Sequence, residues 1–162
     1  MDIAELIARE SVRYTVSLYN SAADRRDYAL LHEVFTEDAR FIIGNEKLEG
    51  RDKIIESSAS RGLKRRAHEP GAFQRHLLGN SIINIMDENT ARSVHYIMVM
   101  TELGLDHSGV YVDRFMRSGD RWLISERQAN PEWKRPDSRL QLAPRPFTTE
   151  ELDLGFKRSE GA

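Results

Sequence analysis

The sequence predicts an α+β fold in which N-terminal helices pack into a strongly curved antiparallel sheet that forms a cone with a central pocket. Two observations predict it. The first 70 or so residues carry helical periodicity, and after residue 72 come four runs rich in Ile, Val, Tyr and Met with short turns between them. Helices followed by an antiparallel sheet form an α+β layer arrangement, and the mouth of such a cone suits a small molecule.

The helical part of the chain divides into two helices, a short strand and a third helix. The first helix is expected over about 20 residues, with an apolar stripe made of Ile3, Ile7, Tyr14, Leu18 and Ala22. A second helix is expected from Tyr28 to Phe35, with Phe35 facing inward. A strand from Ala39 to Ile43 should follow, then a turn at Gly44-Asn45 and a helix from about residue 50 to residue 63.

The second half of the chain reads as a meander of long strands. The runs are "QRHLLGNSIINIMD", "ARSVHYIMVMTEL", "SGVYVDRFMRSG" and "RWLISERQANPEW", and "DENT", "GLDH" and "GD" separate them as turns. Residues 1–133 are therefore expected to form a single domain. Residues 134–162 contain Pro136, Pro144 and Pro146 and are expected to be an arm over the body or partly disordered.

Composition excludes several classes of function. A net charge of −2 argues against nucleic-acid binding, which usually requires a basic domain. The absence of cysteine removes disulfides, thiolate metal sites and cysteine nucleophiles, and it fits a cytoplasmic location. The first residues, "MDIAELIARESV", have no continuous apolar run, so neither a signal peptide nor a membrane span is expected there.

Common catalytic motifs are also missing from the sequence. It contains no dinucleotide-binding glycine motif, no phosphate-binding loop, no HExxH and no GxSxG. Three histidines lie in or beside the expected sheet: His76, His95 and His107. Two of them with Asp106 or Asp113 would suit non-haem iron, but no tight spacing supports that site, so we expect no metal.

His76 and Asp24 are the candidates for acid–base chemistry. In a regular strand, one face would carry the mixed polar and apolar set His76, Leu78, Asn80, Ile82 and Asn84, which suits a strand lining a cavity. Asp24 lies in the charged break between the first two helices. A carboxylate bonded to one imidazole nitrogen raises the basicity of the other. The alternatives are a solvated turn for Asp24 and a hydrogen-bonded edge histidine for His76.

Three stretches carry a resemblance to a known family: "YNSAADRRDYALLHEVFTEDARF", "FQRHLLGNSIINI" and "GVYVDRFMRSGDRWLISERQ". Over residues 5 to 133 the chain resembles the SnoaL-like branch of the nuclear-transport-factor-2-like superfamily. Within that branch it is similar to scytalone dehydratase, the bile-acid 7α-dehydratase and hexachlorocyclohexane dehydrochlorinase, which are lyases with an Asp–His pair. The resemblance places the family's aspartate at Asp24 and its histidine at His76.

The resemblance also has departures. The two tyrosines and second histidine of scytalone dehydratase correspond to Ala23, Ile43 and Thr101 here. A tyrosine of the bile-acid enzyme corresponds to Tyr19, whereas its further aspartate and arginine correspond to Val99 and Asn130. Five residues turn about 140° around a helix, so Tyr19 and Asp24 are expected to share a pocket only if the helix ends between them.

The function expected from these features is that of a small-molecule lyase or isomerase. Asp24 and His76 would abstract a proton from a hydrophobic, cyclic substrate, in a dehydratase, dehydrohalogenase or ketosteroid-isomerase-like reaction that needs no cofactor. The residues expected to bind the substrate are Tyr19, Phe41, Tyr96, Met98, Tyr111 and Asn130.

Two other kinds of function remain open. The alternatives are a β subunit of an aromatic-ring-hydroxylating dioxygenase, with a filled or closed cone and a large Rieske-type partner, or a non-catalytic ligand-binding protein. The family habit also implies a homodimer or homotrimer packed through the outer face of the sheet, since that face would otherwise expose apolar surface.

Overall fold

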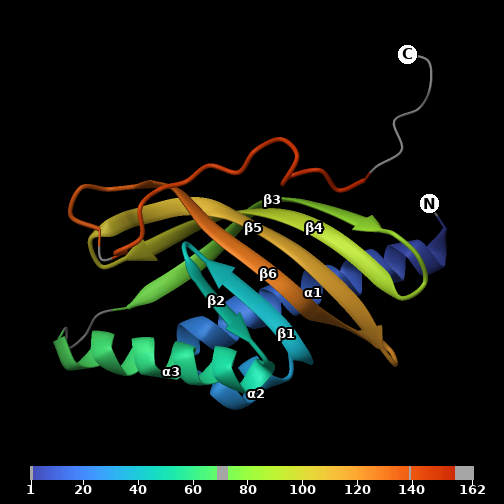
Figure 1. Cartoon of the computed structure of the whole chain (residues 1–162), viewed down its shortest axis with the longest axis horizontal. Helices are drawn as coiled ribbons and strands as arrows, with labels where there is room; N and C mark the ends of the chain where they lie inside the picture. Colours follow the sequence, from blue (N-terminus) through green and yellow to red (C-terminus); the bar gives the residue numbers. More distant parts are fainter. Residues whose placement is uncertain (1, 69–72, 139, 156–162) are drawn as a thin grey trace.

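The computed structural model describes residues 2–68, 73–138 and 140–155 of the 162-residue chain. Two helices lead into a strand hairpin, a third helix follows, and four long strands complete a sheet (Figure 1). The elements are α1 (Ile3–Arg25), α2 (Tyr28–His32), β1 (Phe35–Ile43), β2 (Glu46–Glu49), α3 (Arg51–His68), β3 (Gln74–Ile85), β4 (Thr90–Thr101), β5 (Gly104–Ser118) and β6 (Arg121–Lys134).

The six strands form one open sheet in the order β2-β1-β6-β5-β4-β3. Strands β3 to β6 pair antiparallel, which confirms the expected meander. The sheet is nevertheless mixed, because β1 lies parallel to β6. A parallel pair requires a long crossover, and here α3 and the first three strands of the meander supply it. The α+β cone predicted from the sequence is therefore present with one parallel pair.

Helix α1 packs against the inner, concave face of the sheet through a different row of residues from the one predicted. The buried row is Val12, Thr15, Val16, Tyr19, Asn20 and Ala22. Ile3, Ile7 and Tyr14 are instead 77%, 62% and 64% exposed. The predicted row reaches the core only at its C-terminal end, where Ala22 is buried and Leu18 is partly buried against the core. The prediction is wrong for Ile3, Ile7 and Tyr14, because spacing alone does not fix which side of the helix faces the sheet.

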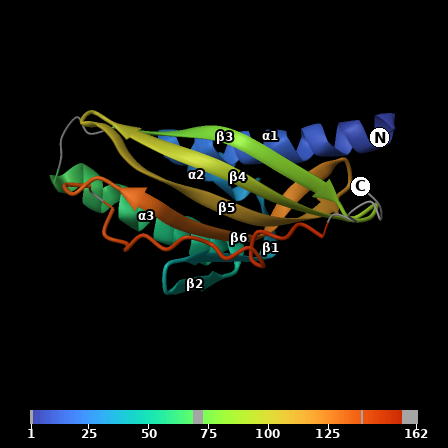
Figure 2. The ribbon, with the colours of Figure 1, turned by 90° about the horizontal axis from the view of Figure 1, so that it is seen from above.

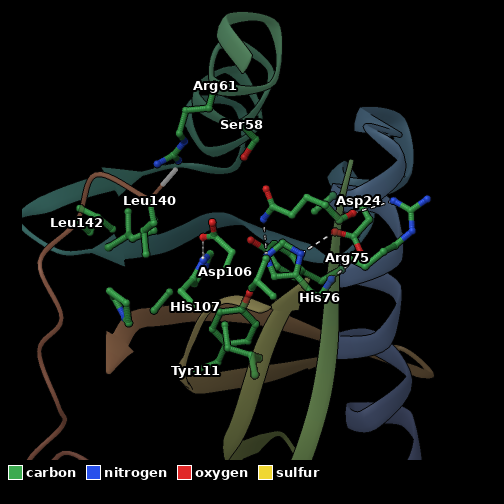
Figure 3. A pocket seen from close by; sticks show the side chains of 18 of the residues that line it. Asp24, Ser58, Arg61, Arg75, His76, Asp106, His107, Tyr111, Leu140 and Leu142 are labelled. Atoms are coloured by element: carbon green, nitrogen blue, oxygen red, sulfur yellow. Dashed lines mark hydrogen bonds and ion pairs between the residues drawn. The ribbon is translucent and has the colours of Figure 1, made fainter. Parts of the chain in front are cut away.

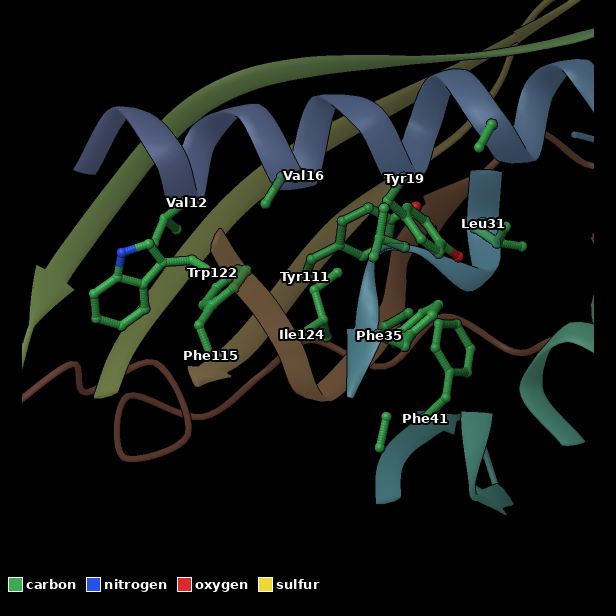
Figure 4. Close-up of a cluster of buried hydrophobic side chains, with 14 of the residues drawn as sticks. Val12, Val16, Tyr19, Leu31, Phe35, Phe41, Tyr111, Phe115, Trp122 and Ile124 are labelled. Carbon is green, nitrogen blue, oxygen red and sulfur yellow. The ribbon is translucent and has the colours of Figure 1, made fainter. Parts of the chain in front are cut away.

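Aromatic side chains gather in the core beneath α1 (Figure 4). The ring of Tyr19 meets those of Phe35 and Tyr111 edge to face, with centroids 5.7 and 6.1 Å apart. Phe35 begins β1 rather than ending α2, because its strand pairs with Ile124 of β6. Tertiary pairing thus shortens the predicted second helix to His32. The third helix instead continues past the predicted residue 63 to His68, and residues 69–72 lie outside the described residues.

A bulge in β3 changes which of its residues face inward. The pairing register with β4 shifts between Leu78 and Ser81. A one-residue shift moves every later side chain to the other face. His76 and Leu78 therefore share the inner face with Ser81 and Ile83, rather than with Asn80 and the alternate residues beyond it as predicted.

The described part of the chain after β6 lies along the outer face of the sheet, opposite α1 (Figures 1 and 2). Phe147 and Leu154 are buried there against Val94 and Val110. The amide of Asn84 donates to the carbonyl of Leu154 at 2.9 Å. Residues 135–138 and 140–155 thus form a strap over the sheet, and the remainder of the predicted tail, 156–162, lies outside the described residues.

Among the helices that the structure describes, none combines the length and the apolar composition needed to cross a bilayer.

Candidate active site

A cavity of about 680 Å³ opens at the wide end of the cone. The last turns of α1, strands β1, β3, β4 and β5, and the start of the strap surround it. Asp24, His76, Asp106 and His107 supply its polar centre (Figure 3). Most of the remaining wall is apolar, so the site combines a few convergent polar groups with a hydrophobic lining, as small-molecule sites do.

Asp24 is held in place by the end of α1. Arg26 adopts a left-handed conformation with φ 58°, and the N–H of Asp27 donates to the carbonyl of Ala22 at 2.9 Å to close the helix. The Asp27 carboxylate turns outward and caps α2 by accepting from the N–H of Leu30 at 3.0 Å. The charged break therefore contains one capping aspartate and one aspartate that faces the cavity.

The Asp24 carboxylate binds His76 twice. Its Oδ1 lies 2.6 Å from the ring Nδ1, and its Oδ2 accepts from the backbone N–H of His76 at 2.9 Å. The two side chains are 8% and 15% exposed, so water competes little for either contact. Two hydrogen bonds to one carboxylate fix the imidazole ring at the cavity wall.

The contacts of His76 also select its tautomer. A carboxylate only accepts, so the Nδ1 atom carries the proton. The amide nitrogen of Gln74 lies 3.2 Å from Nε2, and an amide NH₂ only donates. With the amide in this orientation, Nε2 is the acceptor of the two ring nitrogens.

A second Asp–His pair lines the same cavity. The ring Nδ1 of His107 lies 2.7 Å from Oδ2 of Asp106, and the hydroxyl of Ser138 donates to the same oxygen at 2.6 Å. The sequence suggests these two residues only as metal ligands, and the pair is not predicted from it. Their adjacency at the start of a strand was the only sequence signal.

Four of the residues expected to bind substrate line the cavity: Tyr19, Phe41, Tyr111 and Asn130. Burial raises the pKa of both tyrosines, so their hydroxyls are protonated at neutral pH. Tyr19 and Asp24 both line the cavity although α1 continues to Arg25. The expectation that they would share it only across a helix end is wrong, because the cavity extends around the last turns of the helix.

Tyr96 and Met98 lie outside the cavity. They alternate along β4 with the buried residues His95, Ile97 and Val99, so they point to the outer face and are 46% and 44% exposed. Asn130 borders the cavity, but its side chain is engaged elsewhere. With the amide oriented so that its nitrogen donates to the carbonyl of Ala129, its oxygen accepts from Arg145 of the strap at 2.9 Å. The prediction that Tyr96 and Met98 bind the substrate is wrong, because alternation along β4 points both side chains away from the cavity.

The narrow end of the concave face holds a sealed polar cluster. His95 is fully buried with its ring nitrogens 2.8 and 2.6 Å from the hydroxyls of Ser81 and Ser93, and burial lowers its pKa to about 4. Beside it, Arg127 binds Asp113 through two hydrogen bonds of 2.8 and 2.6 Å. Within the described ranges, no three His, Asp or Glu side chains are placed to hold a metal ion.

Comparison with solved structures identifies the fold class of this protein. An NTF2-like protein with a cystatin-like fold from Novosphingobium aromaticivorans is similar, at 20% identity over 79% of this chain and 88% of that one, with a TM-score of 0.63. None of the curated proteins matches in sequence. The fold is thus that of the NTF2-like α+β cones.

The family then follows from the sequence match. The model of the SnoaL-like domain matches residues 4–128, and the chain belongs to this family. Two further structures share the fold, both from Novosphingobium aromaticivorans. One is a candidate scytalone dehydratase, 18% identical over 90% of this chain and 97% of that one, with a TM-score of 0.76. The other is the β subunit of a candidate aromatic-ring-hydroxylating dioxygenase, 18% identical over 83% and 94%, with a TM-score of 0.64.

Proposed function

We propose that the chain is a small-molecule lyase or isomerase in which His76, oriented by Asp24, removes a proton from a hydrophobic cyclic substrate. One observation carries this proposal. The 2.6 Å contact between Asp24 and Nδ1 leaves Nε2 as a proton acceptor at the wall of a cavity large enough for one or two fused rings. An oriented base of this kind contributes typically about 10² to 10⁴ in rate.

The reaction begins when Nε2 of His76 takes a proton from a carbon beside a carbonyl group. The imidazolium that forms stays bonded to the Asp24 carboxylate, which stabilises its charge. The electron pair left on carbon either expels a leaving group, giving elimination, or is protonated at another carbon, giving isomerisation. Tyr19 and Tyr111 add protonated phenol groups to the same wall, suited to donate to the developing enolate oxygen.

The cavity supports this function over that of a dioxygenase β subunit. A purely structural subunit requires a filled cone, whereas this cone holds an open cavity with a histidine in its accepting form. The alternative of a non-catalytic binding protein predicts a wall of carbon atoms, which the four ionisable groups at the centre argue against.

The proposal is tested with 5-nitrobenzisoxazole, whose elimination needs a base but no acid because its leaving group is a phenolate. We expect the wild-type protein to open the ring, and His76→Gln and Asp24→Asn to lower the rate by about 10²-fold or more. His32→Gln is the matched control, because His32 lies outside the cavity on α2. A wild-type rate for His76→Gln, with an unchanged circular dichroism spectrum, would disprove the role of the base.

We also propose that the protein forms a homodimer through the outer face of the sheet. Beyond the strap, that face exposes a row of large apolar residues that are 44–53% accessible: Leu77, Ile82, Tyr96 and Met98. Sedimentation equilibrium at micromolar concentration should give twice the chain mass, and Met98→Lys should give the monomer. A wild-type monomer under these conditions would contradict this assembly.

A further inference from the structure

We propose that the substrate of this site is an anion. Its carboxylate or phosphate group stays at the mouth of the cavity against Arg25, Arg26 and Arg75, while its hydrophobic ring enters. This inference rests on the proposed function, because it names the substrate class of the same site. It narrows the substrate from any hydrophobic ring compound to one that carries an oxyanion at one end.

The first support is the position of the three arginines around the Asp24–His76 pair. Arg25 and Arg26 directly follow Asp24 at the end of α1, and Arg75 directly precedes His76 on β3. The two hydrogen bonds between Asp24 and His76 join these segments, so the three arginines lie where α1 meets β3 (Figure 3). All three border the cavity. An anion bound by them would lie beside the proposed base.

The second support is that these arginines differ from other exposed arginines in their partners. Among the side chains that the structure describes, no carboxylate contacts Arg25, Arg26 or Arg75. Arg25 donates instead to the carbonyl of Ser21 at 3.3 Å, and Arg75 to that of Gln74 at 2.7 Å. Exposed arginines elsewhere do pair with an acid: Arg40, Arg121 and Arg145. The three charges at the mouth are therefore available to an anionic ligand.

The third support is the backbone of Arg26. Its φ of 58° lies in the left-handed region, which is easy for glycine and unfavourable for a residue with a Cβ atom. Among the described residues, it is the only one other than glycine with a positive φ. Glycine is the usual residue at this place after a helix. An arginine here, against that preference, supports a role for its side chain at the mouth.

Arg75 is held in place by an aromatic neighbour. Its guanidinium carbon lies 5.8 Å from the centre of the Phe73 ring, within the range of a cation–π contact. Phe73 also lines the cavity and is 42% exposed. The contact holds a positive charge beside an apolar ring, and less side-chain freedom is then lost when a ligand binds. A ligand that is apolar at one end and anionic at the other would meet both.

Two acidic residues near the mouth do not neutralise these charges. Glu46 contacts Arg61, a fourth arginine at the cavity, at 3.2 Å, so that pair adds no net charge. The Asp24 carboxylate is 8% exposed and is turned onto His76. Guanidinium groups bind carboxylate and phosphate oxygens through charge-assisted hydrogen bonds and stay protonated throughout the working pH range. The mouth therefore favours an oxyanion, and the apolar wall behind it accepts a ring.

The test compares three ligands that share one fused ring pair and differ in charge: 2-naphthamide, 2-naphthoate and 2-naphthyl phosphate. Binding is measured by isothermal titration calorimetry at low salt. We expect the wild-type protein to bind the preferred anion about tenfold more tightly than the neutral amide. This advantage should shrink at high ionic strength, because salt screens exposed charges. The anion that binds more tightly identifies the substrate as a carboxylate or a phosphate.

Two variants connect the preference to the arginines. Arg75→Gln and Arg26→Gly should each weaken binding of the anion by about threefold or more and change binding of the amide by less than about twofold. Arg26→Gly should also raise the urea midpoint, because glycine adopts this φ without strain, so its weaker binding could not come from unfolding. Arg117→Gln is the matched control, because Arg117 is an exposed arginine outside the cavity. It should bind all three ligands like the wild type.

The contrary outcomes are distinguishable. Equal wild-type affinity for the amide and both anions would overturn the anion site, while uncharged 5-nitrobenzisoxazole would still report on His76 as the base. A loss in Arg117→Gln as large as in Arg75→Gln would reduce the preference to overall charge and would also overturn it. So would equal losses of amide and anion binding in both arginine variants, since they would then only shape the cavity. Binding of none of the three by the wild type would contradict the ligand cavity and the proposed function with it.

Discussion

Two histidines on the same concave face, His76 and His95, have different surroundings, and only those of His76 suit a group that gains a proton. His76 lies at the wide end, bonded to an aspartate and bordering the cavity. His95 lies at the narrow end, fully buried between two serine hydroxyls, with Nε2 4.0 Å from the Asp113 carboxylate. The first has a carboxylate in direct contact to stabilise a proton that it gains, and the second does not.

The two histidines differ because the nearby carboxylates have different bonding partners. Asp24 is bonded to its histidine, whereas Asp113 is bonded to Arg127, whose guanidinium carbon lies 4.1 Å from the ring centres of both Tyr19 and Tyr111. With Asp113 already neutralised, His95 has only neutral partners and stays uncharged. The narrow end is built for packing, and the wide end carries the histidine that we propose as the base.

The largest effect on stability is expected at the buried ion pair. Arg127→Met leaves Asp113 as a buried charge without its partner, which should cost about 3–5 kcal/mol of unfolding free energy. That loss corresponds to a fall of roughly 10 °C in the melting temperature, measured by calorimetry. A matched double variant, Arg127→Met with Asp113→Leu, should recover most of the loss. If the single variant were as stable as the wild type, the Arg127–Asp113 pair would contribute nothing to the stability of the narrow end.

An intermediate effect is expected from pH at His95. Its pKa of about 4 in the folded state lies below the ordinary value of 6.5, so the unfolded chain binds this proton more readily. Stability from this group is complete above pH 6.5 and is lost as the pH falls toward 4. The loss amounts to about 3 kcal/mol, measured by urea unfolding at pH 7, 5.5 and 4.

The variant His95→Gln tests this assignment because glutamine keeps hydrogen-bonding capacity without titrating in this range. Its stability should decline less steeply between pH 6.5 and 4 than that of the wild type. Identical slopes would mean that other groups cause the acid sensitivity.

The smallest effect is expected at Asp27, the capping neighbour of Asp24. Asp27→Ala removes the side-chain acceptor for the Leu30 N–H and should cost about 1 kcal/mol of stability, read from chemical denaturation. Its rate on 5-nitrobenzisoxazole should match the wild type, whereas Asp24→Asn should lose the rate. A comparable loss of rate in both variants would mean that the whole charged break shapes the site.

The sequence predicted the sheet better than the packing of its first helix. Four strands were identified from β-branched and aromatic runs bounded by turns, and all four are present. The buried row of α1 was misassigned because Ile7 and Tyr14 are more hydrophobic than Thr15 and Asn20, yet only the latter row faces the sheet. Which side of a helix meets its partner depends on how the helix docks, and spacing does not encode that.

The candidate site was predicted in part. Asp24 and His76 are 52 residues apart, and their pairing was suggested by resemblance rather than by any local pattern. Tyr96 and Met98 were misplaced because strand alternation fixes which residues share a face but not which face is inside. The Asp106–His107 pair was missed because its place at the cavity depends on β5 lying two strands away from β3, a sheet order that one sequence does not show.

The strap after β6 allows the shape of the cavity to change independently of the strand pairing in the sheet. Leu140, Gln141 and Leu142 contribute to the cavity wall, yet they lie beyond the last strand and outside the hydrogen-bonded ladder. Substitutions there can alter the shape of the cavity without disturbing strand register. Substrate preference can thus diversify through the strap while the sheet keeps its own sequence constraints.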